Sequence, residues 1–461
     1  MNGNWGPVLF TVTVAVRLIA FSVLSDIADT HGVLGRYPII GNDSGGYAAV
    51  ARMLLEEGRF ASPGLAEPQS YVVPGYPVFL AGVLAVAGDV RWAILLQAIL
   101  AGFSTLLIWK IGSAVSHRVG VGAALLFAAD PVGIFYSITI LTETLFIFLL
   151  LICLSIFVRY FDGRIGWFFL SGLVLGIATL TRPTALVVLP VLAIVMWLYS
   201  SMSLRRIITC VLVMGFSFFM IVFPWMLRNK ILFDSWSLTA VATTQWFQQS
   251  APLYYAYKYN VSHAEAYEVF RARLMEINPH KSDDGTLRNT PYMGRVVREF
   301  LLEDPFGYMY FHAVKTLPFF FSDGLRDIAR RMGFVEVNQP NIGNLLLARD
   351  VRGLWDALAH NSLSSVLLLV GASAWFLIII GMTISIAGLR VSSQTGAHII
   401  ALCLLIILAT ALIAGGPNAS ARYRFSVSPF MFIAAVYGFE MFRAYLKNNE
   451  ELSARGGSAS G

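Results

Sequence analysis

The stretch LTETLFIFLLLICLSIFVR, residues 141–159, decides the class of this protein. Its only charged residues are Glu143 near the start and Arg159 at the end. A helix needs roughly 20 apolar residues to cross the hydrocarbon core of a bilayer, and this stretch is close to that length. We therefore predict that it forms a membrane-spanning helix with one charge near each membrane face.

Nine other segments share this character, so the sequence predicts an all-α polytopic membrane protein with about ten transmembrane helices. Of the 461 residues, 57% are hydrophobic and 13% are charged, whereas soluble domains contain roughly 25% charged residues. A water-facing shell cannot hide that much apolar surface. The expected spans cover approximately residues 6–25, 90–113, 119–137, 141–159, 165–181, 183–200, 207–227, 364–389, 397–414 and 426–446.

Charged residues are concentrated in one segment. Residues 228–362 contain 15 of the 33 Lys and Arg residues and 14 of the 27 acids, which predicts an aqueous segment between spans seven and eight. The chain is expected to have four parts: an N-terminal transmembrane module at 1–227 with a first outer loop at 27–89, the outer segment at 228–362, C-terminal transmembrane helices at 363–446, and a flexible cytoplasmic tail at 447–461.

Lys and Arg residues in the short loops give the orientation. Ten of them lie on one side of the predicted membrane, and only Arg182, Arg422 and Arg424 lie on the other. Because positively charged loops stay in the cytoplasm, both termini are expected there, with 27–89 and 228–362 outside. We expect a multi-pass protein of a bacterial inner or plasma membrane. The sequence has no basic tract interleaved with aromatic residues, so it gives no indication of nucleic-acid binding.

The first outer loop predicts two short helices at the membrane interface. Asn42-Asp43-Ser44 suits an N-cap for an amphipathic helix over 47–57, which Gly58 ends. The apolar stretch 74–88 has only 15 residues between its Pro and Gly borders, too few to cross a bilayer. In the second outer segment, the aromatic stretch 306–321 predicts a helix at the level of the lipid headgroups.

Ionisable residues beside the spans are the candidates for chemistry, because they are costly to place in a membrane. Two acids, Asp43 and Glu143, are expected on the outer face together with four arginines: Arg182, Arg228, Arg422 and Arg424. Arginine binds phosphate bidentately and stays charged, so these four are candidate phosphate ligands. Tyr47, Tyr76, His312 and Lys315 are further candidates for a donor or acceptor pocket.

Structural interpretations of the same residues remain open from sequence. Asp43 suits a helix N-cap, and Glu143 suits the positive end of a helix dipole. Arg182 and Arg228 suit arginines that reach toward the interface from helix ends. Asp130, before Pro131, suits either a hydrogen-bond partner inside the bundle or a cap at a helix break. No glycine-rich phosphate loop, Ser/His/Asp set or Cys/His spacing is present, so we expect neither a cofactor nor an obligatory metal.

The chain resembles the polytopic glycosyltransferases of the GT-C fold, in particular the branch with protein O-mannosyltransferases and the lipid A aminoarabinose transferase. The similar stretches are spread from 41 to 429. They are Gly41-Asn-Asp-Ser-Gly-Gly-Tyr47, Tyr71-Val-Val-Pro-Gly-Tyr-Pro77, Tyr136-Ser-Ile-Thr-Ile-Leu-Thr-Glu-Thr-Leu-Phe146, Gly172-Leu-Val-Leu-Gly-Ile-Ala-Thr-Leu-Thr-Arg-Pro183, Pro224-Trp-Met-Leu-Arg-Asn229 and Arg422-Tyr-Arg-Phe-Ser-Val-Ser-Pro429.

The resemblance implies an inverting transfer of a sugar from a polyprenyl or dolichyl phosphate to an acceptor on the outer face. It implies Asp43 as the general base and Glu143 as the second acid of the site. Two departures stand out: no second acid follows Asp43 to make Asp-x-Asp, and no Lys occurs in 71–77. A flippase or transporter of lipid-linked sugars, and a polymerase or ligase of lipid-linked glycans, remain alternatives. The sequence identifies neither the sugar nor the acceptor.

Overall fold

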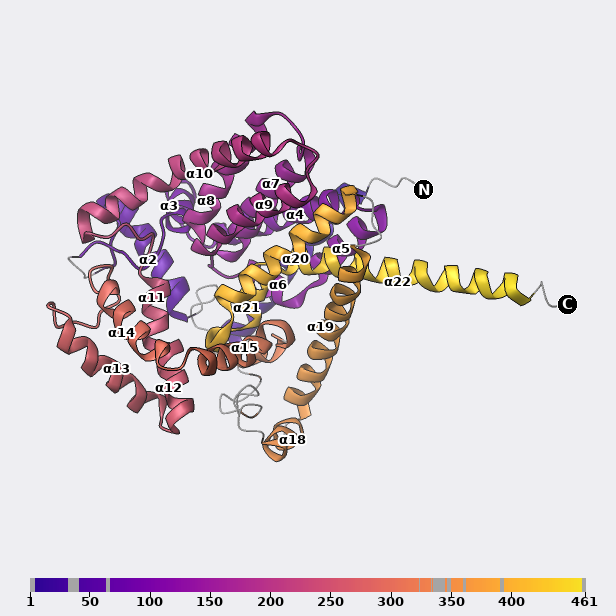
Figure 1. Ribbon diagram of the computed structural model, residues 1–461. Helices are drawn as coiled ribbons and strands as arrows, with labels where there is room; N and C mark the ends of the chain where they lie inside the picture. Colours follow the sequence, from indigo (N-terminus) through magenta and orange to yellow (C-terminus); the bar gives the residue numbers. More distant parts are fainter. Residues whose placement is uncertain are drawn as a thin grey trace.

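In the computed structural model, the described residues are helical almost throughout (Figure 1). They are residues 5–31, 41–63, 67–322, 324–332, 350–359, 362–389 and 394–457, together with Phe334 and Leu345. Within these residues the only β feature is an isolated bridge between Ala61 and Pro68. The predicted all-α class is confirmed.

The helices follow one another along the chain. In order they are α1 (Trp5–His31), α2 (Gly41–Glu57), α3 (Gly75–Ala87), α4 (Trp92–Ser113), α5 (His117–Ala129), α6 (Pro131–Ser137), α7 (Glu143–Arg159), α8 (Ile165–Thr181), η1 (Pro183–Val187), α9 (Val188–Tyr199), α10 (Leu204–Phe233), α11 (Val241–Gln245), η2 (Trp246–Ser250), α12 (Ala251–Tyr259), α13 (His263–Ile277), α14 (Thr290–Leu302), α15 (Pro305–Phe321), α16 (Leu325–Arg331), α18 (Val351–Ala359), α19 (Ser362–Gly388), α20 (Gln394–Ala414), η3 (Gly416–Asn418), α21 (Ala421–Phe425) and α22 (Ser428–Gly457).

Five of these helices are long and apolar enough to span a membrane: α1, α4, α10, α19 and α20. The bent pair α5 and α6 makes a sixth if it counts as one span. Helices are present at all ten expected positions, but the count of ten spans is not confirmed. One physical reason is length, because the 17 residues of α7 and of α8 rise only about 26 Å against a hydrocarbon core of about 30 Å.

Exposed apolar side chains mark the surface of the long helices. On α10, for example, Leu212 and Phe216 are exposed by 66% and 64%. Such residues suit contact with lipid, whose tails are as apolar as the side chains. The long apolar helices support an integral, multi-pass membrane protein.

The bend between α5 and α6 comes from Asp130 and Pro131. Pro131 has no backbone N–H to donate, and Asp130 caps the new helix, with its Oδ1 accepting from the N–H of Val132 at 3.1 Å. The two helices meet at 60°. The sequence interpretation of Asp130 as a cap at a helix break is confirmed.

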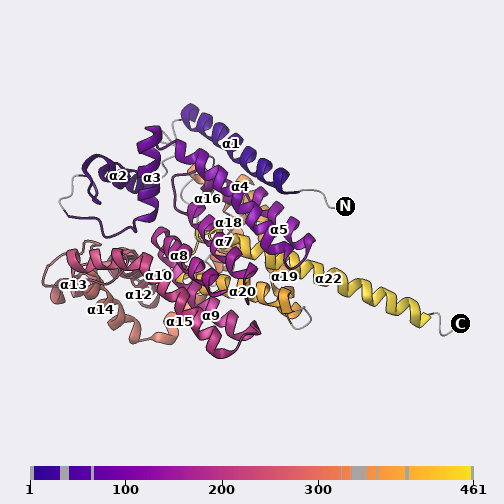
Figure 2. The ribbon, with the colours of Figure 1, turned by 90° about the horizontal axis from the view of Figure 1, so that it is seen from above.

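Two glycines let α8 and α10 pack side by side (Figures 1 and 2). A Cβ added at Gly172 would lie 2.1 Å from Ser217 Oγ and 2.2 Å from the Met214 carbonyl oxygen, and one at Gly176 would lie 2.7 Å from Ile221 Cβ. Small residues four positions apart allow this close approach of helices in membranes. The close packing sets the position of α8 against α10.

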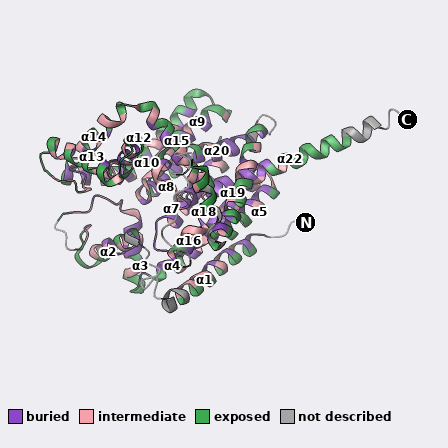
Figure 3. Ribbon diagram, turned by 90° about the horizontal axis from the view of Figure 1, so that it is seen from below, coloured by how far each residue is buried: buried purple, intermediate pink, exposed green. Residues whose placement is uncertain are grey.

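Two helix boundaries differ from expectation. Helix α2 begins at Gly41, so Asp43 lies inside its first turn and not at the N-cap; an acid in the first turn interacts favourably with the helix dipole. Helix α22 continues to Gly457, through most of the segment expected to be a flexible tail. Lys447 and Glu451, one turn apart, lie 3.8 Å from each other there. Figure 3 shows exposed residues along α22 where it leaves the bundle.

Candidate active site

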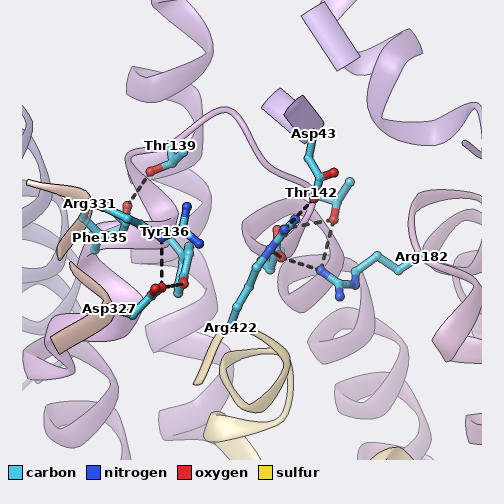
Figure 4. Close-up of polar contacts among 10 residues, drawn as sticks. Asp43, Phe135, Tyr136, Thr139, Thr142, Arg182, Asp327, Arg331 and Arg422 are labelled. Carbon is cyan, nitrogen blue, oxygen red and sulfur yellow. Dashed lines mark hydrogen bonds and ion pairs between the residues drawn. The ribbon is translucent and has the colours of Figure 1, made fainter. Parts of the chain in front are cut away.

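Four charged side chains from distant parts of the chain meet at one site, and Figure 4 labels three of them, Asp43, Arg182 and Arg422. They are Asp43 in α2, Glu143 at the first position of α7, Arg182 directly after α8, and Arg422 in α21. Arg422 bridges the two acids: its Nη1 lies 2.6 Å from Asp43 Oδ2, and its Nε lies 2.5 Å from Glu143 Oε1. Arg182 Nη1 lies 2.7 Å from the same Glu143 oxygen. We call these four residues the ion-pair cluster.

Glu143 is the buried centre of the ion-pair cluster. Its side chain has no exposed surface, and the side chains of Arg182 and Arg422 are only 11% and 21% exposed. The Thr142 hydroxyl accepts from Arg182 Nη1 at 3.2 Å and donates to Glu143 Oε2 at 3.4 Å. A buried carboxylate needs such partners, since an unpaired buried charge is very costly.

Asp43 differs from Glu143 in exposure. Its side chain is 54% exposed, and its contact among the described residues is the ion pair with Arg422. A ligand in the surrounding space can therefore reach the Asp43 carboxylate, whereas the Glu143 carboxylate is covered by two guanidinium groups.

Gln97 holds the turn that presents Glu143. Its Nε2 donates to the carbonyl oxygen of Ser137, the last residue of α6, at 2.9 Å and to that of Thr139, between α6 and α7, at 2.8 Å. The buried Tyr76 hydroxyl in turn donates to Gln97 Oε1 at 2.6 Å. Tyr76, a candidate pocket residue from sequence, therefore lies behind the site and fixes its geometry.

Tyr47 lies one turn after Asp43 on α2. Its ring meets the Tyr76 ring edge-on, with 5.2 Å between centroids. Burial, followed by the negative charge of Glu143, raises the pKa of Tyr47 to about 12, although Arg182 and Arg422 oppose this. At neutral pH the Tyr47 side chain is therefore a neutral hydroxyl beside the ion-pair cluster.

Two of the predicted phosphate ligands have their contacts elsewhere. Arg424 is fully buried; its Nη1 donates to the Phe320 carbonyl oxygen at 3.1 Å, and its guanidinium lies 3.6 Å from the centre of the Trp375 ring. Arg228 Nη1 donates to the Gln69 carbonyl oxygen at 2.9 Å, and the group lies over the Trp225 ring. Neither has a contact with the four residues of the ion-pair cluster among the interactions described.

His312 and Lys315 lie on α15. The His312 Nδ1 is 3.1 Å from the Tyr308 hydroxyl, and the ring packs against Gly416. Burial lowers the pKa of His312, while a hydrogen bond to the Leu412 backbone opposes the shift. Lys315 is buried, which lowers its pKa, and its ammonium lies 5.8 Å from the centre of the Phe311 ring.

A neighbouring group was missed from sequence. Asp327 in α16 accepts from the Tyr136 hydroxyl at 3.1 Å and from Arg331 Nε at 2.9 Å, and it pairs with Arg330 at 2.5 Å. Figure 4 shows Tyr136, Asp327 and Arg331 beside the ion-pair cluster. The four-residue spacing of Asp327 and Arg331 indicates a helical ion pair, but nothing in the sequence places that pair next to Arg422.

The expectation of no obligatory metal stays a prediction. Within the described ranges, no three His, Cys, Asp or Glu side chains gather as a metal site would need. The two acids of the ion-pair cluster both face Arg422.

Solved structures share the fold of this chain. The oligosaccharyltransferase AglB from Archaeoglobus fulgidus, in complex with an inhibitory peptide and a dolichol-phosphate, aligns over 98% of the chain with 12% identity and a TM-score of 0.50. Its apo form aligns over 98% with 13% identity and a TM-score of 0.51. The chain has a GT-C fold. The expected resemblance is thus confirmed at the level of the fold.

Other comparisons extend this finding. The family model for dolichyl-phosphate-mannose-protein mannosyltransferases matches residues 68–227, a part of the GT-C fold that includes Glu143 and Arg182. The chain spans about half the length of AglB, 52% in both alignments. ArnT from Cupriavidus metallidurans aligns with 90% of the chain and 78% of its own length, at 14% identity and a TM-score of 0.37, which is too distant to bear on the GT-C fold. No curated protein sequence matches the chain.

Proposed function

We propose that this protein is an integral-membrane glycosyltransferase that moves a sugar from a polyprenyl-phosphate donor to an acceptor on the outer face of the membrane. The observation that carries the proposal is the ion-pair cluster, in which an exposed acid shares an arginine with a buried one. A base and fixed cations are what transfer from a sugar phosphate needs. The match to the dolichyl-phosphate-mannose family over 68–227 supports a lipid-phosphate donor.

The proposed reaction is a single displacement at the anomeric carbon. The acceptor hydroxyl oxygen attacks that carbon from the face opposite the phosphate, so the configuration inverts. The bond between carbon and phosphate oxygen breaks, and its electron pair stays on the phosphate. The acceptor proton passes to the Asp43 carboxylate, and general-base catalysis of this kind contributes roughly 100- to 10,000-fold.

Arg422 and Arg182 serve the leaving group in this proposal. A phosphate departs as a stable anion, so it needs positive charge more than a proton donor. Arg422 exchanges its contact with Asp43 for one with the phosphate, and this leaves Asp43 Oδ2 free for the acceptor proton. Glu143 stays buried and keeps both guanidiniums in place.

The test is the glycan composition of cells that lack the protein. Mass analysis of envelope glycans and glycolipids should show one sugar missing from one carrier, with the lipid-linked donor accumulating. Wild-type protein, but not the Asp43→Asn variant, should restore the sugar. Purified protein should then transfer that sugar from the donor to the carrier in lipid nanodiscs. Restoration in cells without transfer in nanodiscs would favour a flippase or a transporter, and unchanged glycans in the deletion strain would overturn the proposal.

The sidedness of the site is part of this proposal and has its own measurement. Cysteines introduced at Glu56 and Asp284, both exposed, should react with a membrane-impermeant maleimide in intact cells. A cysteine at Arg205 should react only after the membrane is opened. The reverse pattern would place the ion-pair cluster on the cytoplasmic side.

A further inference from the structure

The ion-pair cluster has no net positive charge. Asp43 and Glu143 carry two negative charges, and Arg182 and Arg422 carry two positive ones. Both acids are already paired with these arginines. A phosphate that enters this cluster gains little net attraction unless a further cation faces it.

Asp327 and its two arginines carry a surplus positive charge. Asp327 is held by two arginines, Arg330 through Oδ1 and Arg331 through Oδ2. Its Oδ2 also accepts from the hydroxyl of Tyr136, a residue of α6. One acid with two arginines leaves one positive charge over, on α16.

Arg331 is the member of this group that faces the ion-pair cluster. In Figure 4 its side chain extends from α16 toward the middle of the view, where Arg422 lies. The pKa of Arg331 is raised: burial lowers it, the charge and hydrogen bond of Asp327 outweigh burial, and the positive charge of Arg422 opposes the rise. Arg331 and Arg422 are thus close enough to repel each other, a state that an anion between them relieves.

The terminal nitrogens of Arg331 are available to a ligand. Among the described contacts, its ion pair and hydrogen bond both run through Nε to Asp327. The side chain is 36% exposed. The Nε contact orients the guanidinium and leaves the Nη side open, which is the geometry of a pre-oriented bidentate donor.

We infer that Arg331, oriented by Asp327, is a further ligand of the donor phosphate and faces Arg422 across it. This inference rests on the proposed function and deepens it. As the bond from the anomeric carbon breaks, the phosphate gains negative charge, and the uncompensated charge of Arg331 stabilises that gain more than it stabilises the donor in its ground state.

The experiment measures binding of a polyprenyl phosphate to the purified full-length protein in nanodiscs. Arg331→Gln should weaken binding by about tenfold, the lower end for a charge-assisted contact because the side chain is partly exposed. Arg331→Lys should restore part of the loss, since the charge remains but the fork does not. The comparison variant is Arg330→Gln, which removes the other partner of Asp327 and with it the surplus charge but leaves the Arg331 fork in place, so it should weaken binding less than Arg331→Gln.

Three further probes show what Arg331 recognises. Binding of the uncharged polyprenol of the same length should not change in Arg331→Gln, and neither should binding of phosphatidylglycerol or of inorganic phosphate. An equal loss for phosphatidylglycerol would mean a general headgroup contact, and an equal loss for inorganic phosphate would mean a site for the free anion; either result overturns the inference.

The outcomes separate this inference from the proposed function. A wild-type protein that transfers sugar while Arg331→Gln and Arg331→Lys both bind polyprenyl phosphate normally would overturn the inference alone. A wild-type protein that binds no polyprenyl phosphate would overturn both. If Arg331→Gln fails to fold, as judged by size-exclusion chromatography, the Arg331→Lys variant carries the decision: normal affinity with normal turnover would overturn the role of the fork.

Discussion

The Glu143 side and the Asp43 side of the ion-pair cluster share Arg422 but are built differently. Glu143 begins a helix of the bundle, is fully buried and contacts two arginines. Asp43 lies in the first turn of α2, is 54% exposed and contacts one arginine. A buried anion between cations organises its surroundings, whereas an exposed anion can meet a substrate. The two acids of one cluster are therefore expected to serve stability and turnover separately.

Asp43→Asn gives the largest expected effect on the Asp43 side. The amide keeps the size of the side chain but cannot accept the acceptor proton, so turnover should fall by about 100-fold or more. Thermal stability should stay close to wild type because the contact is exposed. The measurement is the initial rate in nanodiscs beside a thermal unfolding curve.

A matched control lies on the same helix. Glu56 is an exposed acid of α2, and Glu56→Gln should leave both rate and stability unchanged. If Asp43→Asn folds and turns over at the wild-type rate, Asp43 is not the base, and Glu143 becomes the next candidate despite its burial.

Glu143→Gln should show the opposite pattern, with stability lost first. Removing the charge leaves two largely buried guanidiniums without their shared anion, and breaking a buried pair in this way costs roughly 3–5 kcal/mol. We expect about 3 kcal/mol, since both arginines keep some contact with solvent. Chemical denaturation in detergent micelles measures the loss.

Glu299 provides the comparison for Glu143. It also lies between two arginines, with Arg273 at 2.9 Å and Arg295 at 3.1 Å, but it is 35% exposed. Glu299→Gln should therefore change stability little. Equal losses for the two variants would show that burial does not distinguish them.

Arg422→Lys tests the residue that joins the two sides. An ammonium cannot reproduce the fork by which Arg422 contacts Asp43 and Glu143 together, so kcat/KM should fall by about tenfold. Arg182→Lys should lower it less, because Arg182 contacts only the Glu143 side. A larger effect of Arg182→Lys would move the phosphate contact from Arg422 to Arg182.

Tyr76→Phe should have the smallest effect and sharpens the comparison. It removes the hydroxyl that holds Gln97 behind Glu143, which costs about 1 kcal/mol, and turnover should drop by less than an order of magnitude. Tyr437→Phe removes a hydroxyl that donates to the Gly388 carbonyl oxygen at 3.1 Å, far along the chain. It should cost a similar amount of stability and leave turnover unchanged.

Hydropathy and charge placement were enough to predict the helical class and the cap at Asp130. They did not settle the span count, because α7 and α8 are too short by length alone. The start of α2 was placed too late, since Asn42-Asp43-Ser44 was interpreted as an N-cap although these residues lie in the helix.

The members of the ion-pair cluster could be nominated from sequence, but not their partners. An acid or arginine beside a span is a candidate for function at any position, because placing a charge in or near the membrane costs free energy. That reasoning singled out Arg424 as readily as Arg422, although they are two residues apart and contact different helices. Asp327 and Arg331 lie in a segment rich in charges, so their spacing did not distinguish them as candidate site residues. Only the packing of α16 against α6 places them there.

The close packing of Gly172 against α10 carries a consequence for how function can be lost in relatives of this protein. Gly172 lies ten residues, or about 15 Å along the helix, before Arg182. Because α8 is a continuous helix between them, a shift at Gly172 also moves Arg182. A methyl group at Gly172 would meet Ser217 Oγ at 2.1 Å and force α8 outward, carrying Arg182 with it. A homologue with a bulkier residue at this position would therefore be inactive even if all of its charged residues were intact. A comparison of its acids and arginines alone would wrongly classify it as an active enzyme.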